Sequence, residues 1–114
     1  MRVELPVDTL RDVLAPVNAL VNEAVVSTSQ DALVVHATTE GRAANVTVTL
    51  PANALKRLIP SEQAVGIKVT RTVELLTCLA TSGRVWLTMP PHSTRVSLST
   101  HDSRYQADAI DPAT

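Results

Sequence analysis

Three histidines and one cysteine are the side chains of this 114-residue sequence that could bind a metal or attack a substrate. His36, His92 and His101 stand far apart along the chain, and no cysteine or carboxylate accompanies them at the spacing of a metal site. The three glycines are scattered, so they form no phosphate-binding loop, and no serine lies in a nucleophile elbow. We therefore expect no enzymatic activity, no metal and no cofactor.

Three further residues have alternative interpretations. Cys78 lies in a predicted helix, where we expect a small buried thiol rather than a reactive nucleophile. Trp86 is expected to pack in the core or at an edge, the alternative being an exposed binding aromatic. Asn45 begins an Asn-Val-Thr glycosylation acceptor, which we take as incidental because no secretory signal precedes it.

Charge and composition restrict the classes of protein. Ten basic and eleven acidic residues leave a formal charge of −1, which predicts neither a strong nucleic-acid binder nor an acidic tail. Hydrophobic residues make up 45% of the chain but aromatic residues only 2%, so the core must consist of Val, Leu, Ile and Ala. No apolar stretch approaches the roughly 20 residues of a membrane-spanning helix. We expect a soluble, cytoplasmic protein with no membrane partner.

The first half of the chain predicts one strand, one helix and three strands. A strand at residues 2–5 is followed by Asp8, expected as a helix N-cap, and by a helix that contains Pro16. Its apolar residues recur at helical spacing: Leu10, Val13, Leu14, Val17, Leu20 and Val21. Antiparallel strands are predicted at residues 24–28, 33–38 and 44–50.

The same order of elements recurs after a linker at residues 51–63, in which residues 52–59 have some helical character. We expect a strand at 65–69, a helix at 71–80 closed by Gly83, and strands at 84–89, 94–100 and 103–110. Thr70 or Thr72 should cap this helix, with Glu74 in its first turn. The repeat predicts one α+β domain over residues 1–114, with halves at 1–50 and 64–110 and two helices packed on antiparallel sheet.

Several strings, in the same order, resemble the N-terminal domain of the sliding clamp family, proliferating cell nuclear antigen. They are VDTLRDVLAPVNALVNEA, DALVVHAT, ALKRLIP, VGIKVTRTVELL and SRYQADAIDP. The resemblance implies a DNA-clamp domain whose helices face the channel of a ring and whose sheets form the outer wall. In the family, two such domains make one chain and three chains encircle duplex DNA.

The resemblance also implies site residues. The cations expected to face DNA are Arg11, Lys68, Arg71 and Arg84, offset by Asp12 and Glu74. Two interpretations of these charged residues are open: weak, salt-dependent contact with DNA, or ordinary charge exposed to solvent. A partial groove for client peptides would involve His36, Arg42 and Val46, but TTEGRAANV departs from the family's pattern there. Client binding by replication proteins in the usual way is therefore in doubt.

Family members join subunits by pairing strand edges, and both kinds of edge are expected on this chain. The interface residues would be Val46, Val48 and Leu50 on one strand and Tyr105, Ala107 and Ala109 on the last strand. The leading hypothesis is a single-domain clamp homologue, a DNA polymerase processivity factor, which assembles head to tail into a six-domain ring. The alternative is a regulator or decoy that binds a full-length clamp through one strand edge. An unrelated α+β enzyme and a fragment of a longer gene also remain open.

Overall fold

The computed structural model describes residues 1–39, 45–62, 64–78, 83–89, 95–100 and 103–108. The first half contains the strand β1 (Arg2–Pro6), the helix α1 (Val7–Asn18) and the strands β2 (Glu23–Thr28), β3 (Ala32–Thr38) and β4 (Asn45–Pro51). A 3₁₀ turn (Ala52–Ala54) and a short strand, β5 (Arg57–Ile59), follow. The second half contains β6 (Val65–Lys68), α2 (Val69–Thr77), β7 (Arg84–Thr88), β8 (Arg95–Ser99) and β9 (Arg104–Asp108). The predicted α+β order of elements is confirmed.

The two halves exchange their first strands. One antiparallel sheet has the order β4-β3-β2-β6, and the other has the order β5-β1-β7-β8-β9. Thus β1 pairs with β7 of the second half, with Leu5 opposite Val85, and β6 pairs with β2 of the first half, with Val65 opposite Val26. Each sheet therefore needs residues from both halves of the chain.

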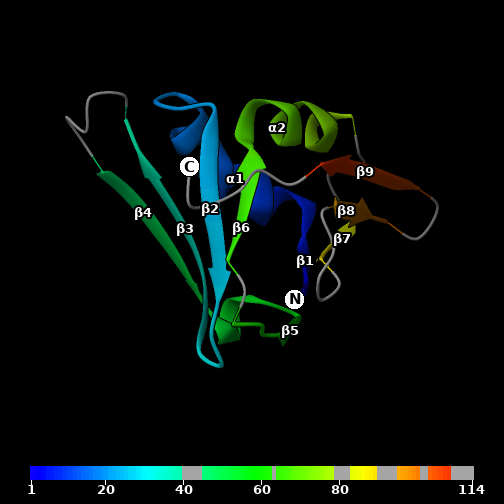
Figure 1. Cartoon of the computed structure of the whole chain (residues 1–114). Coiled ribbons are helices and arrows are strands. Elements are labelled where there is room, and N and C mark those ends of the chain that lie inside the picture. The colour runs from blue at the N-terminus through cyan, green and yellow to red at the C-terminus, as the bar shows by residue number, and fades with distance from the viewer. Residues whose placement is uncertain (40–44, 63, 79–82, 90–94, 101–102, 109–114) are drawn as a thin grey trace.

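Both helices lie side by side at one end of the two sheets (Figure 1). A hydrogen bond from Thr70 Oγ1 to Asn18 Oδ1, 2.7 Å long, joins the start of α2 to the end of α1. The Val69 amide at the start of α2 also donates a hydrogen bond to the carbonyl of Asn22, which lies between α1 and β2. The start of α2 is thus bound to the segment that follows α1. No helix in the described part of the chain is long and apolar enough to cross a membrane.

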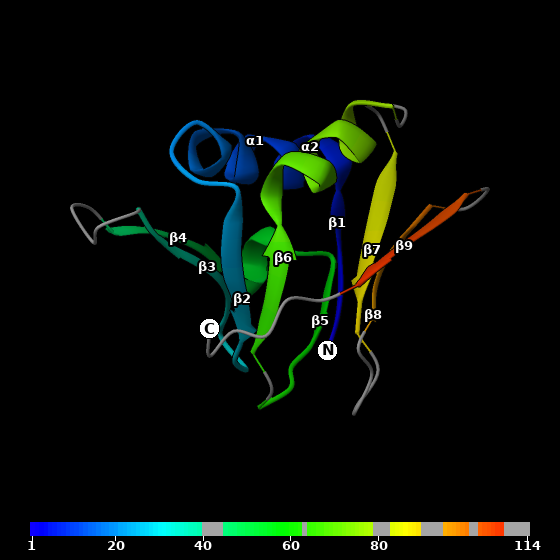
Figure 2. The ribbon, with the colours of Figure 1, turned by 45° about the horizontal axis from the view of Figure 1, so that its top comes forward.

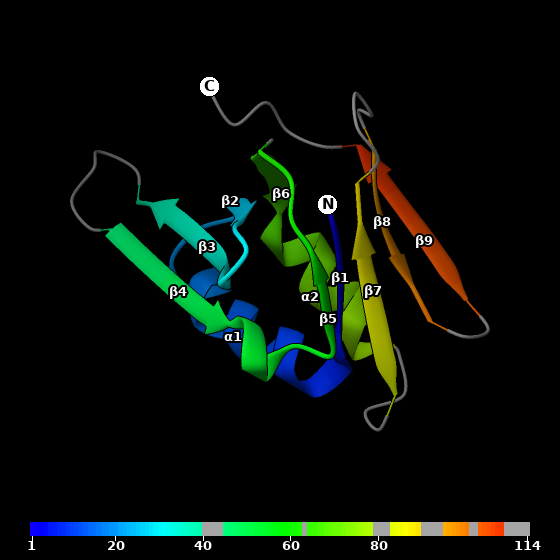
Figure 3. The same ribbon diagram turned by 90° about the horizontal axis from the view of Figure 1, so that it is seen from below.

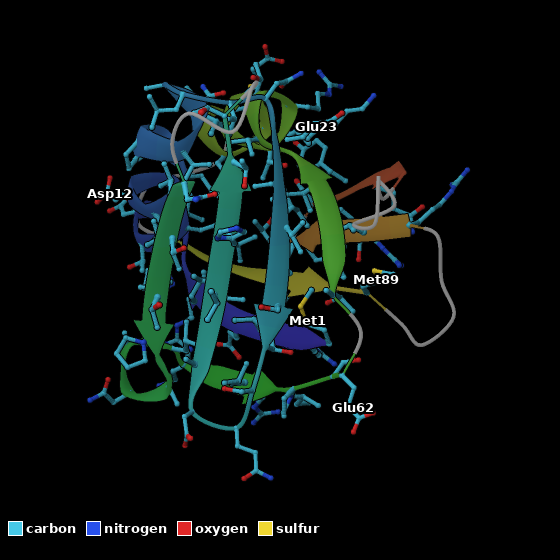
Figure 4. All side chains as sticks on the ribbon, turned by 60° about the vertical axis from the view of Figure 1, so that its left-hand side comes forward. Met1, Asp12, Glu23, Glu62 and Met89 are labelled. Atoms are coloured by element: carbon cyan, nitrogen blue, oxygen red, sulfur yellow. The ribbon has the colours of Figure 1, made fainter. Side chains whose placement is uncertain are left out.

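The core lies between the sheets and beneath the helices, and it consists almost entirely of aliphatic side chains, as the composition predicts. Its largest fully buried members are Leu5, Leu10, Leu14, Leu33 and Leu76, with valines from both sheets. The alternation of more and less buried residues along β2, β3 and β7 turns one face of each sheet toward this core, whereas the three central residues of β1 are all buried. Met1 and Met89 exchange backbone hydrogen bonds of 3.0 Å at the end of β1 and lie together in Figure 4.

Several predicted helix ends are wrong. Asp8 is not the N-cap of α1, because the helix begins at Val7 after Pro6, and Asp8 instead forms an ion pair with Arg11. Neither Thr70 nor Thr72 caps α2, which begins at Val69 with no side-chain cap, so Glu74 lies beyond its first turn. Pro16 does lie inside α1, with its side chain on the exposed side of the helix, and it removes one hydrogen bond to the carbonyl four residues earlier.

Two further corrections concern the ends of the periodic segments. Residues 52–59 form a 3₁₀ turn and β5 rather than a helical linker, because β5 pairs with β1 through Leu58 opposite Val3. Leu20 was expected on the buried stripe of α1, but the helix ends at Asn18 and Leu20 is 55% exposed.

Candidate functional site

The strands β4 and β9 lie at sheet edges on opposite sides of the molecule (Figures 1 and 2). Within the described residues, β4 pairs only with β3, over seven positions from Ala32 opposite Pro51 to Thr38 opposite Asn45. In the same part of the chain, β9 pairs only with β8, over five positions from Ser99 opposite Arg104 to Arg95 opposite Asp108. An edge strand of this length leaves a row of backbone N–H and C=O groups available for another strand.

Five of the six residues predicted for a subunit interface belong to these two edge strands. Val46, Val48 and Leu50 are partly buried and pack against the core, while the threonines between them are exposed. Tyr105 is also partly buried against the core and lies opposite Leu98. Ala107 lies opposite Val96, and Ala109 falls outside the described residues. The edges could therefore pair through their backbones, with the apolar side chains of β4 continuing the core.

The helix layer contains few cations free of nearby acids. Arg11 Nη2 lies 2.7 Å from Asp8 Oδ1, and Arg71 Nη1 lies 3.6 Å from Glu74 Oε2. Asp12 is exposed on α1 and points away from the protein (Figure 4). Lys68, exposed at the end of β6, is the cross-strand neighbour of Glu23. This layer is close to neutral, so its attraction for DNA phosphates is weak.

The order of elements, the two sheets and the paired helices match solved sliding clamps. A structure of A. fulgidus PCNA with the C-terminal region of FEN-1 aligns over 98% of this chain with a TM-score of 0.88 and 22% identity. PCNA from Thermococcus kodakaraensis aligns over 99% with a TM-score of 0.85 and 16% identity. The PCNA2–PCNA3 complex from Sulfolobus tokodaii aligns over 97% with a TM-score of 0.86 and 14% identity.

The chain has the fold of one sliding-clamp domain. It spans about half the length of each of these clamp chains, between 46% and 48%. No family model matches the sequence, and no curated protein matches it. The clamp fold expected from the five sequence strings is thus confirmed by structure.

Arg84, the fourth cation predicted to face DNA, lies in the clamp fold at the beginning of β7. Its Nη1 is 3.3 Å from Oε2 of Glu4, and the Trp86 Nε1 donates a 3.2 Å hydrogen bond to Oε1 of the same carboxylate. Because Val85 and Leu87 face the core, Arg84 and Trp86 lie on the opposite face of the sheet. Trp86 is therefore a partly buried residue of the sheet surface and not of the core.

The predicted client groove of the clamp fold is only partly assembled. His36 lies opposite Thr47, and its Nδ1 is 2.9 Å from the Thr47 hydroxyl. Val46 lies opposite Ala37, one residue away on each strand, so His36 and Val46 project from opposite faces of the sheet. Arg42 falls outside the described residues. The structure therefore does not bring His36 and Val46 together on one surface.

The clamp domain has a cavity of about 50 Å³ between its sheets and beneath α2. Its walls are mainly aliphatic, with Leu14 and Leu75 from the helices and Leu87 and Leu98 from the sheets. A chain without phenylalanine has few side chains large enough to fill the space between two sheets. The cavity is a consequence of this aliphatic core.

The residues first considered for chemistry do not form a reactive site in the described part of the chain. Cys78 is exposed just after α2, which corrects the predicted buried thiol: the helix ends at Thr77 and no longer holds this residue against the core. No three metal-binding side chains gather within the described residues, and His92 and His101 fall outside them.

Sequence reasoning missed Glu4, whose side chain is 10% exposed and joins Arg84 to Trp86 across β1 and β7. The alternation along residues 2–6 could have placed Glu4 on the polar face of a strand. It could not have identified the partners, because they lie eighty residues away in the sequence.

Proposed function

We propose that this chain is a non-enzymatic sliding-clamp homologue that assembles head to tail into a ring of six copies around duplex DNA and acts as a polymerase processivity factor. The observation that supports it best is the presence of two long edge strands, β4 and β9, on opposite sides of one clamp-fold domain. The similarity of the fold to PCNA chains, with TM-scores of 0.85 to 0.88, is the second observation that supports the proposal.

Pairing β9 of one copy with β4 of the next would join the two kinds of sheet into one continuous sheet. The contact is heterologous because the two edges differ, so each added copy leaves one edge of each kind unpaired until the assembly closes. Each matched clamp chain is about twice as long as this one. A ring with the same number of domains as three such chains therefore needs six copies.

The proposed ring holds DNA by enclosure more than by affinity. Arg11 and Arg71 on the helices would face the duplex, with Lys68 at the end of β6 as a further candidate, whereas Arg84 lies on the outer face of its sheet and is bound to Glu4. Because Asp8 and Glu74 lie beside the two helix arginines, the electrostatic attraction is small and decreases further in salt. A client contact would use either His36 or Val46, because the two lie on opposite faces of the sheet, and Arg42 remains a proposed contact outside the described residues.

Sedimentation over a range of concentrations tests assembly directly. The expected mass at high concentration is about 73 kDa, which is six times the 12.2 kDa of one chain. Retention on closed circular plasmid should then survive moderate salt and be lost when the plasmid is cut once. A monomer at every concentration would refute the ring, and equal retention on cut plasmid would refute encirclement.

The same edges support the second candidate, a regulator that adds one strand edge to a full-length clamp. A regulator of this kind needs one unpaired strand edge and does not need to form a closed ring. Mixing the chain with a two-domain clamp should then yield a complex of one added copy on an opened ring. If the chain forms only complexes with itself, the regulator is excluded.

A further inference from the structure

The sheet β5-β1-β7-β8-β9 has an outer face, opposite the core, which carries a concentration of arginines. In register, this outer face contains Arg57, Glu4, Trp86, Ser99 and Arg104 in one row across the five strands. The next row begins with Ile59 and Arg2 and continues through Thr88, Ser97 and Gln106. Figure 3 shows the five strands together with both helices on the other side of the sheet.

Among the side chains that the structure describes, the acid on the outer face is Glu4, and an arginine binds it. Glu4 accepts from Arg84 and Trp86 and is 8% exposed, so its charge is neutralised within the sheet. Asp108 occupies the position opposite Arg95. Arg57 is the cross-strand neighbour of Glu4, whose carboxylate already binds Arg84 and Trp86, and within the described residues neither Arg2 nor Arg104 has an acid opposite it. All three arginines are exposed. The outer face is therefore locally cationic although the whole chain has a formal charge of −1.

Trp86 lies at the centre of this cationic surface. Neighbouring strands are about 4.8 Å apart, so Arg57 and Arg104 lie two strands away on either side of Trp86, at backbone distances of roughly 10 Å. The hydrogen bond to Glu4 fixes the indole on the sheet while leaving the side chain partly exposed. A flat aromatic residue flanked by arginines suits bases that stack and phosphates that pair with guanidinium groups.

The other sheet provides an internal comparison. Its outward positions include no arginine, lysine or acidic residue on these two strands; they are Ala32, Val34, His36 and Thr38 on β3 and Asn45, Thr47, Thr49 and Pro51 on β4. No described tryptophan or arginine lies on either of those two strands. The combination of arginines with an aromatic residue thus belongs to one sheet face and is not a general property of the surface.

We propose that the outer face of the β5-β1-β7-β8-β9 sheet binds single-stranded DNA, with Arg2, Arg57 and Arg104 contacting phosphates and a base stacking on Trp86. The site requires unpaired bases, because the bases of a duplex are stacked on one another and do not present a free face to the indole. Only the choice of DNA over RNA rests on the proposed clamp function. The site itself needs no ring, since every contributing strand belongs to one chain.

Fluorescence of Trp86 tests this proposal directly, because it is the only tryptophan in the sequence. Titration of the full chain with dT20 at 50 mM salt should quench the emission. Three phosphate contacts predict a slope of about −2 for log affinity against log salt, so binding should weaken about 20-fold at 200 mM salt. A 20-base-pair duplex should produce little quenching.

Charge reversal locates the site. Arg57→Glu together with Arg104→Glu should weaken dT20 binding by about tenfold or more and reduce the salt slope by about 1 to 2. The control is Thr47→Glu together with Thr49→Glu on the exposed side of β4 in the other sheet, which also makes the chain more acidic but leaves the arginines in place, and it should change binding less than twofold. If the double reversal reduces thermal stability, Arg57→Gln with Arg104→Gln makes the same test without new acidic charges.

Four results would overturn the proposal: no quenching by dT20 at 50 mM salt, equal losses from the double reversal and the control, duplex binding as tight as single-strand binding, or tighter binding of rU20 than of dT20. Failure of the ring would leave this experiment unaffected, because a short linear oligonucleotide binds to a monomer without enclosure. Conversely, loss of dT20 binding would leave retention on circular plasmid unchanged.

Discussion

Glu4 on β1 and Trp86 on β7 lie directly opposite each other, and the indole Nε1 donates a 3.2 Å hydrogen bond to the Glu4 carboxylate. The second carboxylate oxygen lies 3.3 Å from Arg84 Nη1. No buried side-chain polar atom in the described part of the chain lacks a partner. A single acidic residue of the first half is therefore bound by two residues of the second half, across the pair of strands that joins the halves.

Replacing Glu4 with alanine should lower the free energy of unfolding by about 1–3 kcal/mol, because the partly buried indole N–H loses its acceptor. Urea unfolding followed by far-UV circular dichroism measures this change. Asp8→Ala is the matched control, since the Asp8–Arg11 pair is more exposed and should contribute below about 1 kcal/mol. Equal losses in both variants would show that the Glu4 network contributes no more to stability than an exposed ion pair.

Leu76 and Leu20 should respond very differently to the same substitution. Leu76 on α2 is fully buried in the core, so Leu76→Ala should reduce the free energy of unfolding by about 2–5 kcal/mol. Leu20→Ala removes the same atoms from a residue that is 55% exposed and should cost less than about 0.5 kcal/mol. Chemical denaturation of the two variants makes the comparison. A large loss at Leu20 would instead indicate that it is covered in solution.

The thiol of Cys78 should react with a disulfide reagent while the protein is folded. Its side chain is exposed after the end of α2, and no other cysteine contributes to the measurement. We expect the native rate to lie within about tenfold of the rate in denaturant, because exposure governs access. Cys78→Ser should abolish the colour change. A reaction rate that is several orders of magnitude lower in the native protein than in denaturant would show that Cys78 is buried.

A proline in β4 should prevent association without unfolding the monomer. Successive N–H groups of an edge strand point alternately toward the paired strand and outward, so one of Thr47→Pro and Val48→Pro removes an outward donor. We expect one of these two variants to retain the native circular dichroism spectrum and to sediment as a monomer where the parent chain assembles. His36→Lys serves as the control, because it alters the exposed face of β3, the strand next to β4, and leaves the backbone groups of β4 unchanged.

Assembly by a folded β4 proline variant that matches the parent would exclude β4 as the contact. Loss of assembly in His36→Lys as well would mean that the sheet face, and not the strand edge, makes the contact. Both outcomes are read from the same sedimentation series, with circular dichroism reporting whether each variant is folded.

Much of the local structure could be predicted from short-range patterns. The helical spacing of Leu10, Val13, Leu14 and Val17 correctly predicted the buried side of α1. Alternation in residues 44–50 predicted β4, because side chains of a strand face opposite sides in turn. Helix ends were predicted less well: at Val7 and Val69 the preceding strand runs directly into the helix, so neither helix needed the expected polar cap.

The candidate sites depended on contacts that local patterns do not contain. The resemblance to sliding clamps implied that His36 and Val46 share one groove, yet the register places them on opposite faces. Arg57 and Arg104 are 47 residues apart in sequence, and only the order of five strands brings them to either side of Trp86. The outer face could therefore not be recognised before the sheet order was known.

The sequence by itself determined the type and order of the elements, because periodicity and side-chain volume act over a few residues. Only the tertiary structure decided that β1 joins the sheet of the second half and β6 that of the first. Neither half can cover its own apolar sheet face and helix, so burial of both in one shared core favours the exchange. Pairing across more than eighty residues, such as Glu4 with Trp86, follows from that shared core and not from any local preference.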